Sequence, residues 1–500
     1  MKRQRNSIQC KRTYTNDDEQ LNGEKSNECE NEACTQVNKL TIYFSVHTER
    51  KQYCSINATF KEGKIRVDCM SYEVVLGRNE KDRKRLGTKG CVLVGKHYVK
   101  MGETSSLSNE IYMDVSRSHV VFLCGKRGSG KSFSLAVIAE GMAALQKEVR
   151  KNIGVLIMDT MGIYWSMKYP NERMRELLEQ WGMSPQGLDI QLYAPYGKVT
   201  DMQNEGIPVD EGFSIRPADI SPSHWPALFE LDPSSGTGAL LESTADVLSK
   251  KGSFSIDEFI EAIENSGADK DTIRAAKNLL GSAQRWGLFY KQATPIHKMV
   301  EPGKITVLDI SPYAATSSAW NVRALVIGIV GEQLFEYRMR ARKAEEYKAL
   351  KQALSYQSDS GNTEPVIWML IDEAHEFLPR EGKTPATDAL VTILREGRQP
   401  GLSLILATQQ PGKIHTDVMT QSDIIISHRI TAKADTDALG MLTQSYMRAG
   451  LDVLLNELPR MKGAAVVLDD NNEKLYSMQV RPRISWHGGD DPDALRGVDE

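Results

Sequence analysis

Three glycines, a lysine and a serine stand at fixed spacing in GKRGSGKS, the segment from Gly125 to Ser132. They fit G-x-x-x-x-G-K-[ST], a loop whose backbone N–H groups point at phosphate oxygens from a concave turn. Lys131 is placed to reach the β- and γ-phosphates of ATP, and the Ser132 hydroxyl is a ligand for Mg²⁺. We predict that the nucleotide is bound by Gly125, Lys126, Arg127, Gly128, Ser129, Gly130, Lys131, Ser132 and Phe133.

Two acids follow an apolar run later in the chain, where PVIWMLI leads into Asp372 and Glu373. Beside a phosphate loop, such a strand end is typical of the Mg²⁺ side of a nucleotide site. We predict that Asp372 holds the Mg²⁺ shell, mostly through water, and that Glu373 polarises the water that attacks the γ-phosphate. The alternative is that two acids merely end a strand.

A second polar strand end and an arginine pair complete the candidate catalytic set. Gln409 follows the apolar run LSLILAT, and an amide there can sense the γ-phosphate, although it can also be a simple polar strand end. Arg395 and Arg398, three residues apart, would project from nearly the same face of a helix end. They either cap that helix or supply an arginine finger to a neighbouring subunit, and the sequence does not choose between these roles or between the two residues.

The elements that must position these residues alternate between strands and helices. An apolar run from His119 to Cys124 enters the phosphate loop, and 131–147 is predicted to be a helix with the phosphates at its N-terminus. Further buried strands are predicted at 154–159, 189–193 and 304–310. This alternation predicts an α/β fold with a parallel sheet, into which 216–299 is a helical insertion.

The two ends of the chain have a different character. Residues 1–37 are polar, mixed in charge and poor in aromatics, which predicts a disordered tail. Residues 38–112 contain short strand-like runs broken by Gly, Asn and charged turns, which predicts a small β-barrel or sandwich. We assign 471–500 to a C-terminal extension.

Composition sets outer limits on function. The chain has 500 residues and a formal net charge of -4, so any nucleic-acid contact must come from local basic loops. No apolar run reaches the ~18 residues of a membrane span, and the N-terminus lacks the apolar core of a signal peptide. Seven cysteines, an odd number, fit reduced thiols, so we expect a cytoplasmic protein without a membrane partner.

The longer motifs resemble one family closely, the HerA-type hexameric ATPases of the HerA/FtsK superfamily. The resemblance covers about 95–490 and lies in the phosphate loop and in DTMGIYW, LIDEAHEFLP, LREGRQPGLSLILATQQPGKIHTDVMTQSD and VRPRISWHGG. The family often has Asp-Pro where this chain has Asp159 and Thr160. His375, in the string DEAH, is interpreted as a local hydrogen-bonding residue rather than as a mark of two-core helicases.

The resemblance implies a RecA-like P-loop NTPase core in 113–215 and 300–470, a helical insertion in 216–299 and an N-terminal barrel of the HAS type in 38–112. It also implies a homo-hexamer that uses ATP and Mg²⁺ to move along double-stranded DNA. Relatives act with a nuclease or effector, either a NurA-type nuclease in DNA-end processing or a defence effector in antiviral complexes. The alternative is an ATP-binding ring that scaffolds or gates an effector.

Basic residues on loops are the candidate DNA contacts. They are Lys168, Arg380, Lys383 and Lys413, and each is otherwise a solvated surface side chain. A motor that tracks a duplex must tolerate every base sequence, so we expect contacts mainly with phosphates. The sequence contains no H-E-x-x-H motif and no acidic cluster typical of a two-metal nuclease, so a partner would have to cut the DNA.

Overall fold

The computed structural model describes residues 39–45, 53–61, 64–69, 73–101, 104–314, 319–355, 364–440 and 445–489. The chain divides into two compact units, Met1–Met70 and Ser71–Glu500. In the first unit, β1 (Lys39–Ser45), β2 (Tyr53–Lys61) and β3 (Lys64–Cys69) form an antiparallel sheet in that order. The predicted disordered tail, 1–37, lies outside the described residues, and the barrel stays a prediction.

The second unit is built on a 13-stranded sheet in the order β10-β9-β11-β8-β12-β13-β7-β14-β15-β16-β5-β6-β4. The strands from β10 to β14 run parallel, which confirms the predicted α/β class. Their bounds are Glu211–Phe213 (β10), Ile190–Pro195 (β9), Ile305–Asp309 (β11), Ile153–Asp159 (β8), Val366–Ile371 (β12), Leu402–Thr408 (β13), Val120–Cys124 (β7) and Ile424–His428 (β14).

The rest of the main sheet comes from the two ends of this unit. Strands β15 (Ala464–Asp469), β16 (Lys474–Val480), β5 (Cys91–Met101) and β6 (Thr104–Asp114) pair antiparallel, and β4 (Val74–Leu76) pairs parallel with β6. We predicted one β domain over 38–112. The structure divides those residues, because β4, β5 and β6 join the main sheet through the pairing of β5 with β16.

Parallel strands with helices on both faces read as continuous apolar runs, and β8 and β13 are buried at every position. Helix α2 (Lys131–Ala143) covers one face of the sheet, while α10 (Ala319–Ser355) and α11 (Thr387–Glu396) cover the other. Because the strands are parallel and in register, the residues that follow β7, β12 and β13 meet at one edge. We call this the carboxyl edge, and the opposite one the amino edge.

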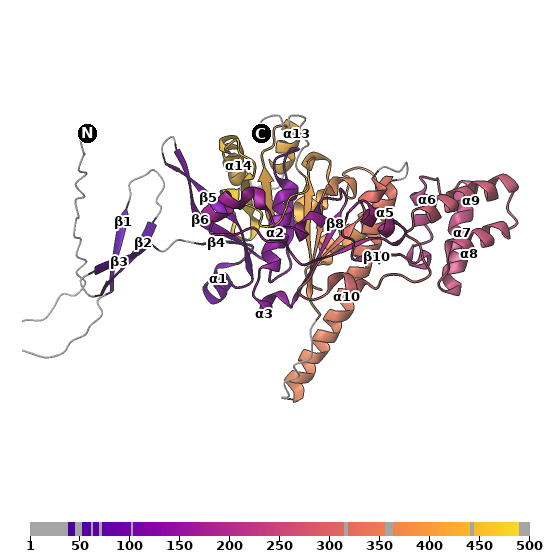
Figure 1. The fold of residues 1–500 in the computed structure, drawn as a ribbon, viewed down its shortest axis with the longest axis horizontal. Coiled ribbons are helices and arrows are strands. Elements are labelled where there is room, and N and C mark those ends of the chain that lie inside the picture. The colour runs from indigo at the N-terminus through magenta and orange to yellow at the C-terminus, as the bar shows by residue number, and fades with distance from the viewer. Residues whose placement is uncertain are drawn as a thin grey trace, which may run out of the picture. The chain divides into compact units, whose positions relative to one another are not determined.

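A group of helices lies between β10 and β11 in the sequence, within the predicted insertion. Figure 1 shows α6 (His224–Leu228), α7 (Gly236–Lys251), α8 (Ile256–Glu264) and α9 (Lys270–Arg285) gathered beyond the β10 end of the sheet. They pack around Trp225 and Phe259, whose rings meet edge to face with centroids 5.1 Å apart. Among the described residues, no helix has the length and apolar character needed to cross a membrane.

The remaining helices are short. They are α1 (Glu80–Leu86), α3 (Lys147–Arg150), α4 (Arg175–Gln180), α5 (Val199–Asn204), α12 (Thr416–Gln421), α13 (Lys433–Gly440) and α14 (Ser445–Glu457).

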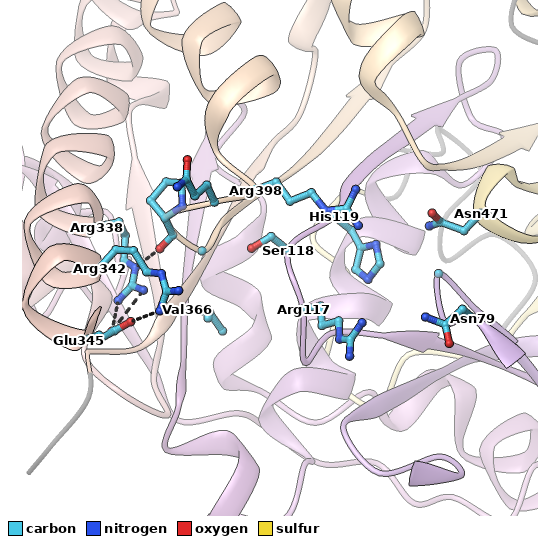
Figure 2. Close-up of a pocket in the computed structure, with 14 residues that line it drawn as sticks. Asn79, Arg117, Ser118, His119, Arg338, Arg342, Glu345, Val366, Arg398 and Asn471 are labelled. Atoms are coloured by element: carbon cyan, nitrogen blue, oxygen red, sulfur yellow. Dashed lines mark hydrogen bonds and ion pairs between the residues drawn. The ribbon is translucent and has the colours of Figure 1, made fainter. Parts of the chain in front are cut away.

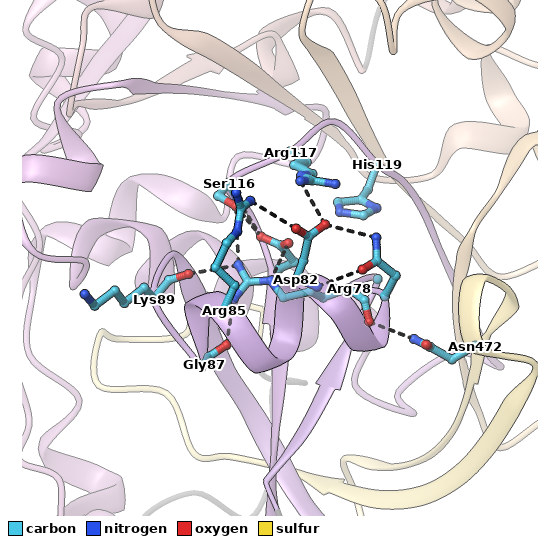
Figure 3. A network of polar contacts seen from close by, with 12 residues as sticks. Arg78, Asp82, Arg85, Gly87, Lys89, Ser116, Arg117, His119 and Asn472 are labelled. Carbon is cyan, nitrogen blue, oxygen red and sulfur yellow. Dashed lines mark hydrogen bonds and ion pairs between the residues drawn. The ribbon is translucent and has the colours of Figure 1, made fainter.

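A buried arginine, Arg78, is the centre of a network of polar contacts, as Figure 3 shows. Arg78 is 2% exposed, and its Nε donates to Asp114 Oδ2 at 2.9 Å. Its other guanidinium nitrogens donate to the carbonyl oxygens of Gly87 and Lys89 at 2.7 and 2.8 Å. A buried guanidinium is tolerated only when its donors are satisfied, so this network ties the turn after β4 to the end of β6.

Candidate nucleotide-binding site

The predicted phosphate loop connects β7 to α2 at the carboxyl edge. Gly125 and Gly128 have φ values of 154° and 71°, a region that side chains disfavour. A Cβ added at Gly125 would come within 2.6 Å of both His428 Cβ and Ser129 Oγ, so this glycine also allows the loop to pack closely. The Lys126 N–H donates to the Arg429 carbonyl oxygen at 3.1 Å, which anchors the loop to the segment after β14.

Lys131 is the first residue of α2, so its ammonium group lies where the helix N-terminus favours anions. The residue is 5% exposed, and its Nζ donates to the Lys126 carbonyl oxygen at 3.2 Å. Burial lowers the pKa of Lys131, and the nearby charges of Glu373 and Asp372 oppose that shift. The lysine is therefore placed between the loop and the acid pair.

The acid pair directly follows β12. Asp372 is 2% exposed, and its Oδ2 accepts a hydrogen bond from the Tyr164 hydroxyl at 3.0 Å. Glu373 has φ 51° and ψ 41°, a left-handed conformation that is costly for a residue with a side chain. Burial, and next the charge of Asp372, raise the pKa of Glu373 to about 7. A carboxylate with that pKa is suited to general-base chemistry near neutral pH.

Gln409 lies beside the predicted base. Its side-chain amide donates to Glu373 Oε1, while Glu373 Oε2 is buried and has no hydrogen bond among the described residues. His375 Nδ1 is 3.6 Å from that second oxygen and 3.1 Å from Thr408 Oγ1. The loop lysine, both acids and Gln409 are thus brought together at the carboxyl edge, and one catalytic oxygen is left free.

Ser132 and Asp372, the predicted Mg²⁺ ligands, offer a hydroxyl and a carboxylate. The Ser132 hydroxyl has no hydrogen bond to another described residue, so its lone pairs are available. Mg²⁺ keeps several waters and binds proteins through one or two such oxygens together with phosphates. The donor set therefore fits Mg²⁺ carried in with a nucleotide.

Tyr164 is a site residue that the sequence reasoning did not assign. Asp159, at the end of β8, accepts hydrogen bonds from the N–H groups of Met161, Gly162 and Tyr164 at 3.1, 2.8 and 2.7 Å. This turn forms with Thr160 at the position where the family often has proline, and it brings the buried Tyr164 ring to Asp372. The signal was the string DTMGIYW, but its partner lies 208 residues away.

The two candidate arginines lie at the other edge of the sheet. Arg395 Nε donates to Asp417 Oδ2 at 2.6 Å, whereas the exposed Arg398 has no ion pair or hydrogen bond among the described residues. Figure 2 shows Arg398 beside Ser118 and His119, where it lines a cavity of about 420 Å³. Those two residues precede β7 and the phosphate loop follows it, so the length of β7, about 16 Å, separates them. Neither arginine is brought to the chain's own loop.

Comparisons with known proteins agree with the motifs. The family model DUF87, described as "Helicase HerA, central domain", matches residues 98–326. The chain is 23% identical over 336 residues to the DNA double-strand break repair helicase HerA of Pyrococcus furiosus, an alignment that covers 62% of this chain and 56% of that protein. A probable helicase of the same name from Methanocaldococcus jannaschii is 37% identical over 73 residues, 15% of this chain and 14% of that one.

Among solved structures, VirB4 of Thermoanaerobacter pseudethanolicus is 12% identical, with a TM-score of 0.46 over 79% of this chain and 97% of that one. The alignments with the curated relatives cover little more than half the length of the Pyrococcus protein and far less of the Methanocaldococcus protein.

Proposed function

We propose that this chain is a HerA-type ATPase and that it acts as one subunit of a hexameric ring that translocates on or unwinds double-stranded DNA. The observation that carries the proposal is the meeting of Lys131, Asp372, Glu373 and Gln409 at one edge of the sheet. The curated relatives are named as helicases, and the family model that matches residues 98–326 covers the phosphate loop. We also propose that the ring acts with a partner nuclease or effector. The alternative is an ATP-binding ring that serves as a scaffold or gate for an effector and is not a processive motor.

The hydrolysis step follows from the charges at the site. The loop's backbone N–H groups and Lys131 hold the β- and γ-phosphates. Ser132 and Asp372 would hold Mg²⁺, which would supply positive charge beside those phosphates. Glu373 orients the attacking water and accepts its proton, for which a pKa near 7 is well matched. Gln409 holds one oxygen of that carboxylate, so the free oxygen, Oε2, is the one that faces the water.

A ring explains the arginine at the amino edge. Arg398 is separated from its own loop by the length of β7, so it can reach a γ-phosphate only in another subunit. Arg395 is held by Asp417 and Arg398 is not, which favours Arg398 as the residue that acts in trans. Among the described residues, neither arginine side chain donates a hydrogen bond to a carbonyl oxygen at the end of α11, so helix capping is not supported.

The test has two parts. Native mass spectrometry is performed with and without ATP and duplex DNA, and steady-state ATP hydrolysis is measured with and without duplex DNA. We expect six-subunit assemblies and a turnover that rises when duplex is added. Lys131→Ala should abolish hydrolysis and weaken ATP binding, because it removes the charge that holds the phosphates. A monomer under all conditions would remove the basis for the trans arginine, and turnover indifferent to DNA would favour the scaffold or gate.

A further inference from the structure

The two segments that leave the catalytic strands at the carboxyl edge pair with each other. The N–H of Arg380 donates to the Lys413 carbonyl oxygen at 2.8 Å, and the N–H of His415 donates to the Leu378 carbonyl oxygen at 2.8 Å. Pro379 and Ile414 form an antiparallel bridge between these contacts. The segment after Glu373 and the segment after Gln409 therefore form one joined unit.

This unit borders a cleft of about 660 Å³, which we call the loop cleft. The residues of interest along it are His375, Arg380, Gln410, Gly412 and Lys413. Arg380 and Lys413 are both exposed, and the one side-chain contact of either is Arg380 Nη1 to the Gly412 carbonyl oxygen at 3.4 Å, within the part of the chain that the structure describes. Two cations therefore face the cleft without a carboxylate partner.

The acids of the loop cleft do not cancel that charge. Glu376 is ion-paired with Arg323 at 3.1 Å, which leaves the exposed Glu381 against two cations. The other basic loop residues predicted from the sequence are already engaged. Lys168 Nζ lies 2.7 Å from Asp210 Oδ2, and Lys383 Nζ lies 2.7 Å from Asp388 Oδ1. Of the four candidates, only the pair at the loop cleft is available for an outside anion.

A short chain of polar contacts connects the loop cleft to the predicted base. Gln409 and Gln410 are neighbours, and the first donates to Glu373 while the second lies 3.4 Å from His375 Nε2. His375 Nδ1 faces Thr408 Oγ1 at 3.1 Å and Glu373 Oε2 at 3.6 Å. If the Gln410 amide donates to Nε2, the ring proton is on Nδ1, on the side of the base.

We propose that the loop cleft binds the phosphodiester backbone of duplex DNA through Arg380 and Lys413, and that His375 couples its occupancy to Glu373. The inference rests on the proposed function, since it names where the duplex is held and how hydrolysis responds. A phosphate drawn to Lys413 pulls on the segment that carries Gln410, and His375 passes that displacement to the free oxygen of the base. His375 is thus a positioning residue.

The binding half is tested with the full chain and labelled duplex at several salt concentrations. Arg380→Gln and Lys413→Gln should each weaken binding to all sequences alike and lower the slope of log K against log salt by about 1. Lys383→Gln is the matched control, because it removes the same charge from a nearby exposed loop that is already ion-paired. Slopes for the two cleft variants equal to that of the control would overturn the site.

The coupling half is tested with His375→Asn, which keeps a polar side chain but cannot span both contacts. The ratio of turnover with duplex to turnover without it should fall by about fivefold, while duplex affinity in the absence of nucleotide stays the same. By linkage, a non-hydrolysable ATP analogue should also change duplex affinity less in this variant. A wild-type ratio in both measurements would overturn the role of His375, and loss of fold would affect affinity as well.

Failure of this inference differs from failure of the proposed function. If wild-type turnover rises with duplex and the cleft variants respond like Lys383→Gln, the DNA motor stands and the loop cleft is not its contact. If wild-type protein neither binds duplex nor responds to it, both are overturned.

Discussion

Two glutamates of the nucleotide-binding unit, one fully buried and one half-buried, have opposite surroundings. Glu140, on α2, is fully buried and accepts hydrogen bonds from Arg481, Arg483, Ile484 and Ser485 of the C-terminal segment. Glu373 has one side-chain hydrogen bond, from Gln409, and a buried oxygen with none among the described residues. One carboxylate is saturated and the other is left partly unsatisfied.

The difference separates structure from chemistry. A buried carboxylate that two guanidinium groups and backbone N–H groups surround has no lone pair left for a substrate. A half-buried carboxylate with one buried and unpaired oxygen, a left-handed backbone and a pKa raised to about 7 is costly to the fold, and such costs persist where function requires them. The same substitution, glutamate to glutamine, should therefore have opposite results at these two positions.

The largest effect is expected at Glu373. Glu373→Gln keeps the shape of the side chain but removes the proton acceptor, so turnover should fall by about 10²–10⁴-fold, with ATP binding retained. The unfolding free energy should not fall, because the variant removes a partly buried charge. Single-turnover hydrolysis, ATP titration and urea unfolding of the same preparation measure all three. Full DNA-dependent turnover in this variant would show that another group is the base.

Glu140→Gln tests the other half of the comparison. The amide cannot accept from all its neighbours and leaves Arg481 and Arg483 buried with too little negative charge, which should cost about 3–5 kcal/mol of unfolding free energy. Turnover per folded molecule should change far less than in Glu373→Gln. Glu148→Gln, at an exposed glutamate of α3, is the control and should leave stability unchanged. A stable Glu140→Gln variant would mean that the C-terminal segment is held by other contacts.

The same contrast shows which features of the site could be predicted from the sequence. Gly125 to Ser132, Asp372 and Gln409 were assigned because each follows a strand and the chemistry is written in local spacing. The contacts of Glu140 were not foreseen, since they join residues 341 to 345 positions apart. The pairing of β5 with β16 was not predicted either, because these strands lie far apart in the sequence. Through this pairing, β4, β5 and β6 belong to the main sheet. Local motifs name the reacting groups, and long-range packing decides which are held and which are left free.

Asp372 is intermediate between the saturated Glu140 and the partly unsatisfied Glu373, because the Tyr164 hydroxyl donates to one of its oxygens. The Tyr164→Phe variant tests what that hydrogen bond contributes. Without the hydroxyl, Asp372 Oδ2 loses its donor, and the Mg²⁺ concentration for half-maximal hydrolysis should rise about tenfold. Tyr313→Phe is the control, because that buried hydroxyl donates to the Trp286 carbonyl oxygen at 3.0 Å, beside the helical insertion. Both variants should lose some stability. An equal Mg²⁺ dependence in the two would show that Tyr164 is only a packing residue.

The smallest effect concerns a pair of acids that faces no substrate. Asp159 and Asp309 are register partners on β8 and β11, and Asp309 Oδ2 is buried with no hydrogen bond among the described residues. Burial, and next the charge of Asp309, raise the pKa of Asp159 to about 8 against its three backbone donors, and burial raises the pKa of Asp309 as well. Two carboxylates this close cannot both ionise without cost.

Because these pKa values are higher in the folded than in the unfolded chain, the folded state retains the protons to a higher pH. The resulting stability is fully present below the unfolded pKa and is lost as the pH rises through about 8. Asp309→Asn keeps an oxygen for the Ser311 N–H and removes one acid, so it should flatten this loss and gain about 1 kcal/mol over wild type near pH 9. Urea unfolding between about pH 6 and pH 9 measures it, with the exposed Asp271→Asn as control. An unchanged pH slope in Asp309→Asn would show that the Asp159–Asp309 pair does not contribute to the pH dependence of stability.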